Sequence, residues 1–129
     1  MAKVRKHLSE PWFSLILTGL KVVEGRLNRG DFAAMKVGDE VIFENDDFKF
    51  VHRELRVKIT RTVKYESFFK YLENEELAAC LPGVPSIDVG LKVYAAYFPD
   101  CDINTAKAVA VHFELVSKIF EVRDVSPSP

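Results

Sequence analysis

The stretch Thr18–Leu27, TGLKVVEGRL, joins a helical hydrophobic pattern to an alternating one. The apolar residues around its start recur at helical spacing, and they are Phe13, Ile16, Leu17 and Leu20. Gly19 is placed to end that helix. From Lys21 onward the period becomes two, as in a β-strand, with Glu24 and Arg26 on one side. The stretch therefore predicts a corner between a helix and a strand.

Three charged side chains, Lys21, Glu24 and Arg26, lie in this predicted corner. Burying an ionisable group costs desolvation free energy, so such groups are normally paired, exposed or functional. One interpretation is structural, with Glu24 pairing with a neighbouring cation. The other is a binding site, in which Lys21 contacts a phosphate or a carbonyl, Arg26 a phosphate or a base edge, and Glu24 accepts from an exocyclic amine. If the site is catalytic, Lys21 and Glu24 are the groups able to transfer protons.

The composition is that of one globular domain, with 129 residues of which 48% are apolar and 29% charged. We expect residues 1–124 to form the domain and residues 125–129 a frayed tail. No apolar run is long enough to cross a bilayer, and the start lacks the apolar segment of a signal peptide. We therefore expect a cytoplasmic protein, leaving the nucleus open, with no membrane partner and with a monomer favoured.

The sequence gives no indication of a metal or another cofactor. The two cysteines, Cys80 and Cys101, lack the spacing of metal ligands and are expected to be reduced thiols. The three histidines show no ligand spacing either. The formal net charge is −1, so binding to a nucleic acid would need a local basic patch.

The remaining pattern predicts a mixed α+β domain. Ser9 is positioned to cap the first helix, and Asn74 and Ser86 to cap two later ones. Strands are expected at Lys3 to Leu8, Lys21 to Leu27, Glu40 to Glu44, Glu54 to Lys64 and Lys107 to Val116. A run of helices separates the last two of these strands. We expect the sheet to curl or close into a small β-barrel with flanking helices.

A possible basic patch follows the strand from Glu54 to Lys64. Its alternation places Arg56, Lys58 and Lys64 on one face, interleaved with threonines. Such a face suits the backbone of an RNA strand. The open alternative is an ordinary solvated face on an outer strand.

Several motifs agree in order and approximate separation with those of one protein family. They are G-x-K-x-x-E-x-R from Gly19 to Arg26, K-x-G-D-x-x-x-F from Lys36 to Phe43, and Y-F-P from Tyr97 to Pro99. With these motifs the chain resembles the ASCH domain family of the PUA-like superfamily. The resemblance implies a closed or partly open β-barrel with a cleft at the motif lysine, acid and arginine. It also implies binding of RNA or of a modified nucleoside.

One enzymatic branch of that family hydrolyses the amide of N4-acetylcytidine with a lysine, a threonine and a later glutamate. Lys21 matches the lysine, but Glu24 stands at the position of the threonine. The expected position of the glutamate falls in residues 81–85, which contain no acid. A hydrolase or ribonuclease using Lys21 and Glu24 is therefore an alternative to binding alone, and a protein–protein adaptor is a further one.

Overall fold

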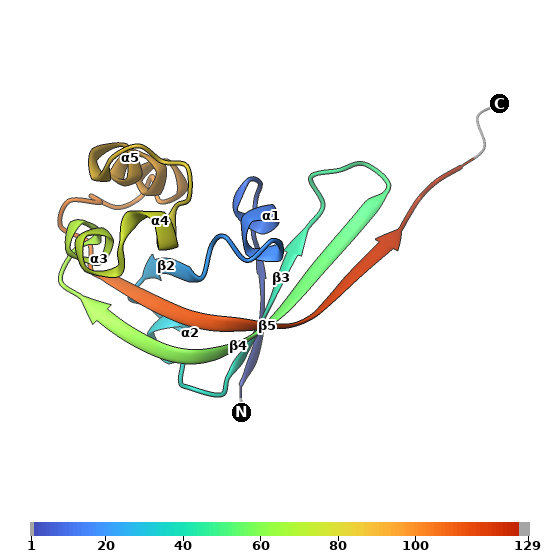
Figure 1. Ribbon diagram of the computed structural model, residues 1–129, viewed down its shortest axis with the longest axis horizontal. Helices are drawn as coiled ribbons and strands as arrows, with labels where there is room; N and C mark the ends of the chain where they lie inside the picture. The colour runs from blue at the N-terminus through green and yellow to red at the C-terminus, as the bar shows by residue number, and fades with distance from the viewer. Residues whose placement is uncertain (1, 127–129) are drawn as a thin grey trace.

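A computed structural model describes residues 2–126, in which five strands form one sheet in the order β1-β3-β4-β5-β2 (Figure 1). The predicted tail residues 127–129 lie outside the described residues. β1 pairs with β3 in parallel, and the other three pairs are antiparallel. The strands are β1 (Lys3–His7), β2 (Val23–Leu27), β3 (Glu40–Asn45), β4 (Val51–Tyr65) and β5 (Ala108–Val122).

Five helices accompany the sheet, and three of them lie in the segment between β4 and β5. They are α1 (Trp12–Leu17), α2 (Gly30–Ala33), α3 (Phe68–Glu75), α4 (Leu77–Cys80) and α5 (Ile87–Tyr97). Figure 1 shows α3, α4 and α5 grouped at one end of the curved sheet, and α1 set apart from them. None of the helices within residues 2–126 combines the length and apolar character that a membrane span requires.

The mixed α+β class is confirmed, and of the predicted closed or partly open barrel the closed form is wrong. β1 and β2 are the two ends of the sheet, and they do not pair within residues 2–126. The ring of Phe32 on α2 lies between them, 6.0 Å from Nζ of Lys6 on β1 and 5.0 Å from the guanidinium of Arg26 on β2. The sheet therefore stays open at a seam between β1 and β2.

Two predicted helix caps are wrong because the side chains find other partners. The carboxylate of Glu10, and not Ser9, accepts from the backbone N–H of Ser14, with an N···O distance of 2.8 Å. Asn74 donates to the carbonyl of Lys70 and does not cap the next helix. The cap at Ser86 is confirmed, since its hydroxyl accepts from the N–H of Val89.

The predicted end of the first helix at Gly19 is confirmed. α1 ends at Leu17 with Thr18 as its C-cap, and Gly19 follows with a positive φ of 81°. Leu20 continues the apolar spacing of the helix but lies beyond this turn, and it is 62% exposed.

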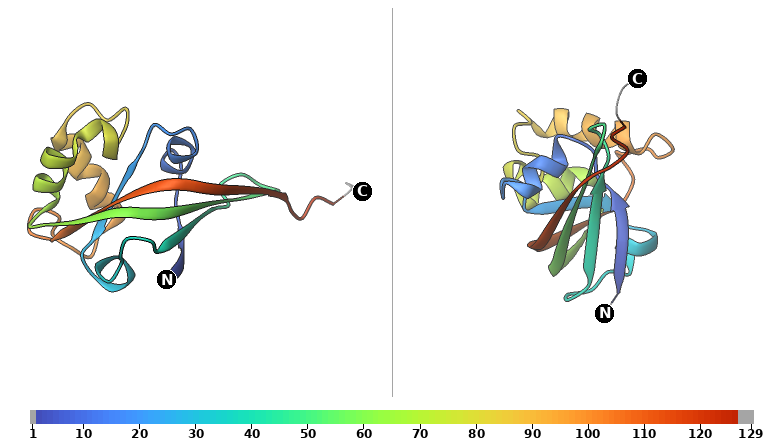
Figure 2. Two further views of the ribbon diagram at one scale, coloured as in Figure 1. Left: turned by 60° about the horizontal axis from the view of Figure 1, so that its bottom comes forward. Right: turned by 90° about the vertical axis from the view of Figure 1, so that its right-hand side faces the viewer.

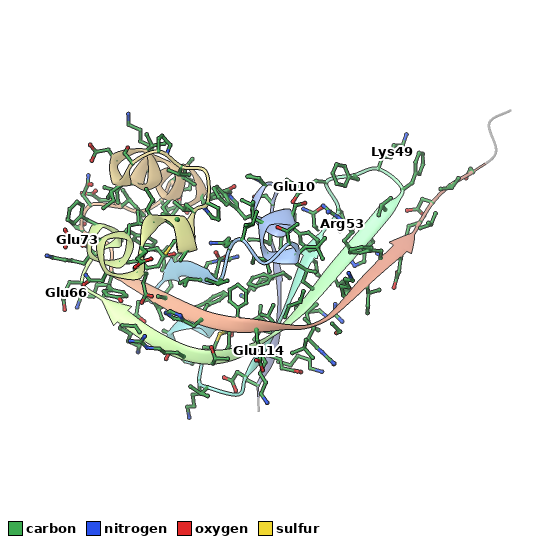
Figure 3. All side chains as sticks on the ribbon, in the orientation of Figure 1. Glu10, Lys49, Arg53, Glu66, Glu73 and Glu114 are labelled. Atoms are coloured by element: carbon green, nitrogen blue, oxygen red, sulfur yellow. The ribbon has the colours of Figure 1, made fainter. Side chains whose placement is uncertain are left out.

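The curvature of the sheet comes with two irregularities in the long β4–β5 pair. Register shifts lie between Arg56 and Val57 and between Ile59 and Arg61. The second leaves Thr60 as an extra residue, a β-bulge that displaces the alternation of β4 by one position. Toward Val51 and Val122, β4 and β5 run on as an arm that leads away from α3, α4 and α5 (Figure 2, left). β3 also pairs with β4 in this arm, from Lys58 as far as Arg53, which is labelled in Figure 3.

Close packing between β2 and α3 requires a glycine at position 25. A Cβ added to Gly25 would overlap the ring of Tyr71, which is fully buried. The Tyr71 ring packs edge to face on Phe68, and its hydroxyl is 2.9 Å from the hydroxyl of Tyr94 on α5. Gly25 thus lets β2 approach the aromatic cluster that anchors α3 and α5.

We predict that Gly25→Ala lowers the free energy of unfolding by about 1–3 kcal/mol, because the added methyl group overpacks against Tyr71. Urea denaturation measures the change. In a Tyr71→Ala background the same substitution should cost much less, since the ring is gone. An equal cost in both backgrounds would show that the ring is not the obstacle.

Candidate functional site

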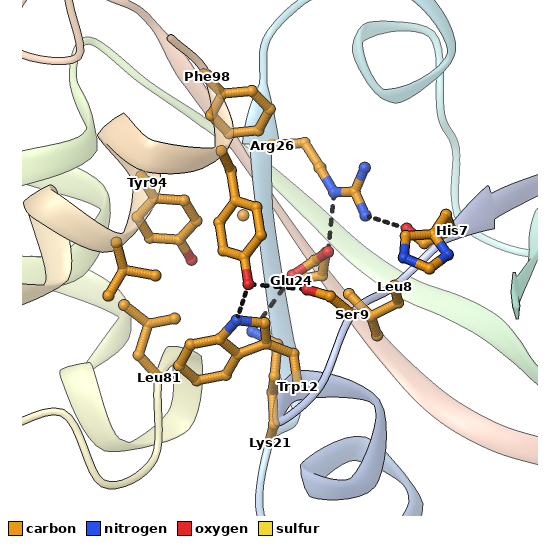
Figure 4. A pocket seen from close by; sticks show the side chains of 13 residues that line it. His7, Leu8, Ser9, Trp12, Lys21, Glu24, Arg26, Leu81, Tyr94 and Phe98 are labelled. Atoms are coloured by element: carbon orange, nitrogen blue, oxygen red, sulfur yellow. Dashed lines mark hydrogen bonds and ion pairs between the residues drawn. The ribbon is translucent and has the colours of Figure 1, made fainter. Parts of the chain in front are cut away.

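A cavity with a volume of about 310 Å³ lies at the open seam between β1 and β2 (Figure 4). Its walls come from the end of β1, from α1, from the corner before β2, from β2 itself, and from α5. The lining residues are His7, Leu8, Ser9, Trp12, Lys21, Glu24, Gly25, Arg26, Leu81, Val93, Tyr94, Tyr97 and Phe98. The failure of the barrel to close therefore creates the cavity.

Lys21 is held just before β2 with only 1% of its surface exposed. Its Nζ donates to the carbonyl oxygen of Val23 at 2.7 Å and to that of Cys80, and lies 3.3 Å from Oε1 of Glu24. Burial lowers the pKa of this ammonium, and the carboxylate of Glu24 opposes that effect. An ammonium has three protons to donate, and three acceptors surround this one.

Glu24 connects Lys21 to Arg26. The Nε of Arg26 donates to Oε2 of Glu24 at 2.8 Å, so each carboxylate oxygen faces one cation. Burial raises the pKa of the Glu24 carboxyl, but Arg26 and Lys21 together lower it below its ordinary value of 4.5. Glu24 is 5% exposed and is held as a carboxylate beside the cavity.

Arg26 is the member of the trio that solvent and a ligand can reach, since 21% of its side chain is exposed. Its guanidinium lies 5.0 Å from the ring centroid of Phe32 and also approaches the carbonyl of His7. Unlike Lys21, it keeps donor protons that face no protein acceptor within residues 2–126. Arg26 is therefore the group best placed to donate to a bound molecule.

Aromatic side chains form the opposite wall of the cavity (Figure 4). The hydroxyl of Tyr97 accepts from the indole Nε1 of Trp12 at 2.8 Å and lies 2.8 Å from Oγ of Ser9. These contacts tie α5 to α1 and to the end of β1 across the seam. Tyr97 remains 48% exposed, so it stands at the boundary between the cavity and solvent.

The structure brings Lys21, Glu24 and Arg26 together but leaves Arg56, Lys58 and Lys64 outside the cavity. The predicted single basic face is also divided. Lys64 pairs with Val109 after the bulge at Thr60, on the sheet face opposite to that of Arg56 and Lys58.

Acidic side chains accompany the two basic residues that do share a face. Lys58 lies opposite Glu40 of β3 and Glu114 of β5, and Arg56 is 3.8 Å from Glu40. This face of the sheet therefore carries mixed charges, which matches the alternative of an ordinary solvated face.

Ser9, Trp12, Tyr97 and Tyr94 have a larger part in the cavity than sequence reasoning gave them. Ser9 was predicted only to cap the first helix. The signal for Tyr97 was its place in the Y-F-P motif, but nothing in the sequence pairs it with Ser9, 88 positions away.

One group of potential metal ligands, Glu44, His52 and Glu54, lies on the outer face of the sheet. The guanidinium of Arg5 contacts Glu44 at 2.6 Å and Glu54 at 3.0 Å, and His52 is hydrogen bonded to Glu54. A protein cation already neutralises these carboxylates, so the group is explained by ion pairing. Cys80 and Cys101 are both free thiols.

Comparisons with known proteins agree with this architecture. A family model for the ASCH domain matches residues 7–117. The crystal structure of the hypothetical protein PH0355 is 34% identical with a TM-score of 0.76, over 88% of this chain and 99% of that one. Protein PF0455 from Pyrococcus furiosus is 30% identical with a TM-score of 0.65, over 88% and 97% of the two chains. No curated protein matches the chain.

The fold also recurs at low identity. An ASCH domain from Lactobacillus crispatus JV V101 is 16% identical with a TM-score of 0.64, over 88% of this chain and 79% of that one. At this level of identity the likeness concerns the fold alone.

We predict that Lys21→Met lowers the free energy of unfolding at neutral pH by roughly 3–5 kcal/mol, because it leaves a buried carboxylate and two carbonyls without their cation. Chemical denaturation measures the loss. Lys70→Met is the matched control, since Lys70 is exposed and pairs only with Glu73 on the surface. That control should change stability by less than about 0.5 kcal/mol.

The stability that Lys21→Met removes should depend on pH. The pKa of Glu24 is lowered in the folded protein, so its ionised form adds stability above the ordinary value of 4.5, and this stability is lost as the pH falls through the folded pKa. The difference in unfolding free energy between wild type and Lys21→Met should therefore become smaller in acid. A difference that stays constant with pH would contradict an ion pair with Glu24.

Proposed function

Because the chain belongs to the ASCH domain family, whose fold is PUA-like, we propose that it binds RNA or a modified nucleoside in the cavity at the seam. The observation that supports this most is the arrangement of the Glu24–Arg26 pair opposite Trp12 and Tyr97 across a cavity of about 310 Å³. Small-molecule sites commonly occupy ~300–1,000 Å³, so this volume suits one nucleoside-sized group.

The chemistry of the walls suits a nucleobase. An aromatic wall offers faces on which a base can stack, as aromatic residues do in proteins that bind single-stranded RNA. Arg26 can donate to a carbonyl or ring nitrogen on the edge of the base, or to a phosphate. The carboxylate of Glu24 has further lone pairs for an exocyclic amine.

Lys21 has a different role in this proposal. Its three donors are directed at Val23, Cys80 and Glu24, and it is almost fully buried. It orients the carboxylate of Glu24 and adds positive charge beneath the cavity. Arg26 and Glu24 are the charged groups that meet the ligand.

Hydrolysis is the second candidate function. A buried lysine with a lowered pKa beside a carboxylate, in a cavity, is an arrangement that catalytic sites use. Two features weigh against it. All three protons of Lys21 have protein acceptors, and Glu24 is the single acid among the residues that line the cavity. The nearby Glu75 lies instead against Tyr65 and His112.

We predict that Tyr97→Ala and Arg26→Ala each weaken ligand binding about tenfold or more, since stacking on an aromatic side chain contributes roughly 1–3 kcal/mol per base. Titrations would use cytidine, N4-acetylcytidine, and single-stranded and hairpin RNA at low and moderate salt. Lys58→Ala, on the mixed-charge face, should bind like wild type. Negligible binding of every probe by wild type and variants alike would contradict the proposal and leave a protein adaptor as the better interpretation.

For the hydrolytic candidate, we expect any turnover of N4-acetylcytidine or of RNA to disappear in Glu24→Gln, which cannot take up a proton. Chromatography of the products after prolonged incubation measures turnover, and Glu75→Gln serves as the control outside the cavity. Activity that survives Glu24→Gln would exclude this carboxylate as the base. A wild type that binds a probe but leaves it intact would favour binding alone.

A further inference from the structure

The outer edge of β5 lacks a partner strand over most of its length. β2 pairs with β5 only from Ala108 to His112, while β5 continues to Val122. Within residues 2–126, no hydrogen bond from another part of the chain reaches the backbone of residues 114–120 from that side. An edge of this kind exposes a row of free N–H and C=O groups.

The side chains along this free edge are unusually apolar for an exposed strand. Five of them are more than a third exposed, and they are Leu115, Val116, Ile119, Phe120 and Val122. The paired strand β4 shows the contrast, since Leu55 and Val57 opposite this segment are fully buried. Figure 2 (left) shows β5 running out along the arm beyond the helices.

The unpaired edge of β1 carries more basic side chains than the free edge of β5 does. β1 presents Lys3, Arg5 and Lys6 among its five residues. Charged side chains, lysine above all, are the usual protection of an edge strand against pairing with another chain. The free edge of β5 carries one lysine, Lys118, and the acids Glu114 and Glu121, with exposed apolar side chains between them. It is therefore less protected by positive charge than β1 is.

We propose that the free edge of β5 pairs antiparallel with the same edge of a second copy of this chain, joining two sheets across a two-fold axis. Such an interface is isologous, because each copy contributes the same surface. A two-fold axis perpendicular to the sheet keeps each residue on its own face, so residues that pair must share a face.

Charge and packing select the register of this pairing. With Ile119 on the axis, Lys118 of one copy lies beside Phe120 of the other, and Ser117 lies beside Glu121. The pairing ends there, because Val116 is the extra residue of a bulge in β5. Each of these pairs occurs twice. An ammonium beside an aromatic ring and a hydroxyl beside a carboxylate are both favourable. Registers centred on Lys118 or on Glu121 would place like charges directly opposite, which is destabilising.

The sequence left the oligomeric state open, with a monomer favoured, because it does not show which strand edges are free. The paired edge lies on the arm, away from the residues that line the seam cavity. The proposal is therefore independent of what the cavity binds.

The mass of the full chain in solution, measured by light scattering over a series of concentrations, tests this pairing. We expect the wild type to form a dimer. The dissociation constant of this dimer should rise about tenfold or more in Ile119→Lys, since two ammonium groups then meet on the axis. Val37→Lys is the control, because Val37 is 66% exposed in the loop before β3. A wild type that stays monomeric, or an unchanged dimer in Ile119→Lys, overturns the proposal.

Cross-linking tests the register without disturbing the charge. Residues opposite each other on antiparallel strands have Cα atoms about 4.5–5.5 Å apart, which a disulfide can span. In a Cys101→Ser background, Ile119→Cys should form a covalent dimer on mild oxidation. Ser117→Cys, which faces Glu121 in this register, should cross-link several-fold less. Equal cross-linking at both positions, or none at Ile119→Cys, contradicts the register.

Discussion

The hydrogen bonding of one buried ammonium holds the site together. Removing a lysine from water costs several kcal/mol unless its protons find acceptors, and Lys21 finds them in Val23, Cys80 and Glu24. Cys80 ends α4, so the contact fastens the helical segment between β4 and β5 to the start of β2. The same contact fixes the carboxylate of Glu24. The contacts that hold the fold together and the charges that line the cavity are therefore one arrangement here.

The cavity depends on the open seam as much as on these charges. Had β1 paired with β2, strand backbone would occupy the space into which Tyr97, Trp12 and Ser9 now extend. Phe32 of α2 lies between the two strands, and the hydroxyl of Tyr97 links α5 to Ser9 and to Trp12 of α1. The polar side of the cavity comes from β2 and the aromatic side from α1 and α5. The position of α5 relative to α1 consequently sets the width of the site.

Local periodicity was sufficient to predict the strands and the side of β2 that carries Glu24 and Arg26. It could not reveal that Lys21 is buried, because its acceptors include a carbonyl 59 positions away. The prediction of a single basic face on β4 was wrong for a related reason. One extra residue at Thr60 moved Lys64 to the other side, and acids from neighbouring strands, Glu40 and Glu114, appear only when the register is known. Features that depend on one strand were predictable, and those that need a neighbour were not.

The edges of the sheet show different solutions to the same physical problem of unpaired backbone. At the seam, a cavity separates β1 from β2, and the basic side chains of β1 discourage another strand from pairing there. Along β5 beyond His112 the charged side chains alternate with exposed apolar ones, although the neighbouring residues of β4 are well buried. Free N–H and C=O groups flanked by exposed apolar side chains favour a partner strand. Because the chain that bears this edge is also the chain that could complete it, self-pairing needs no other component.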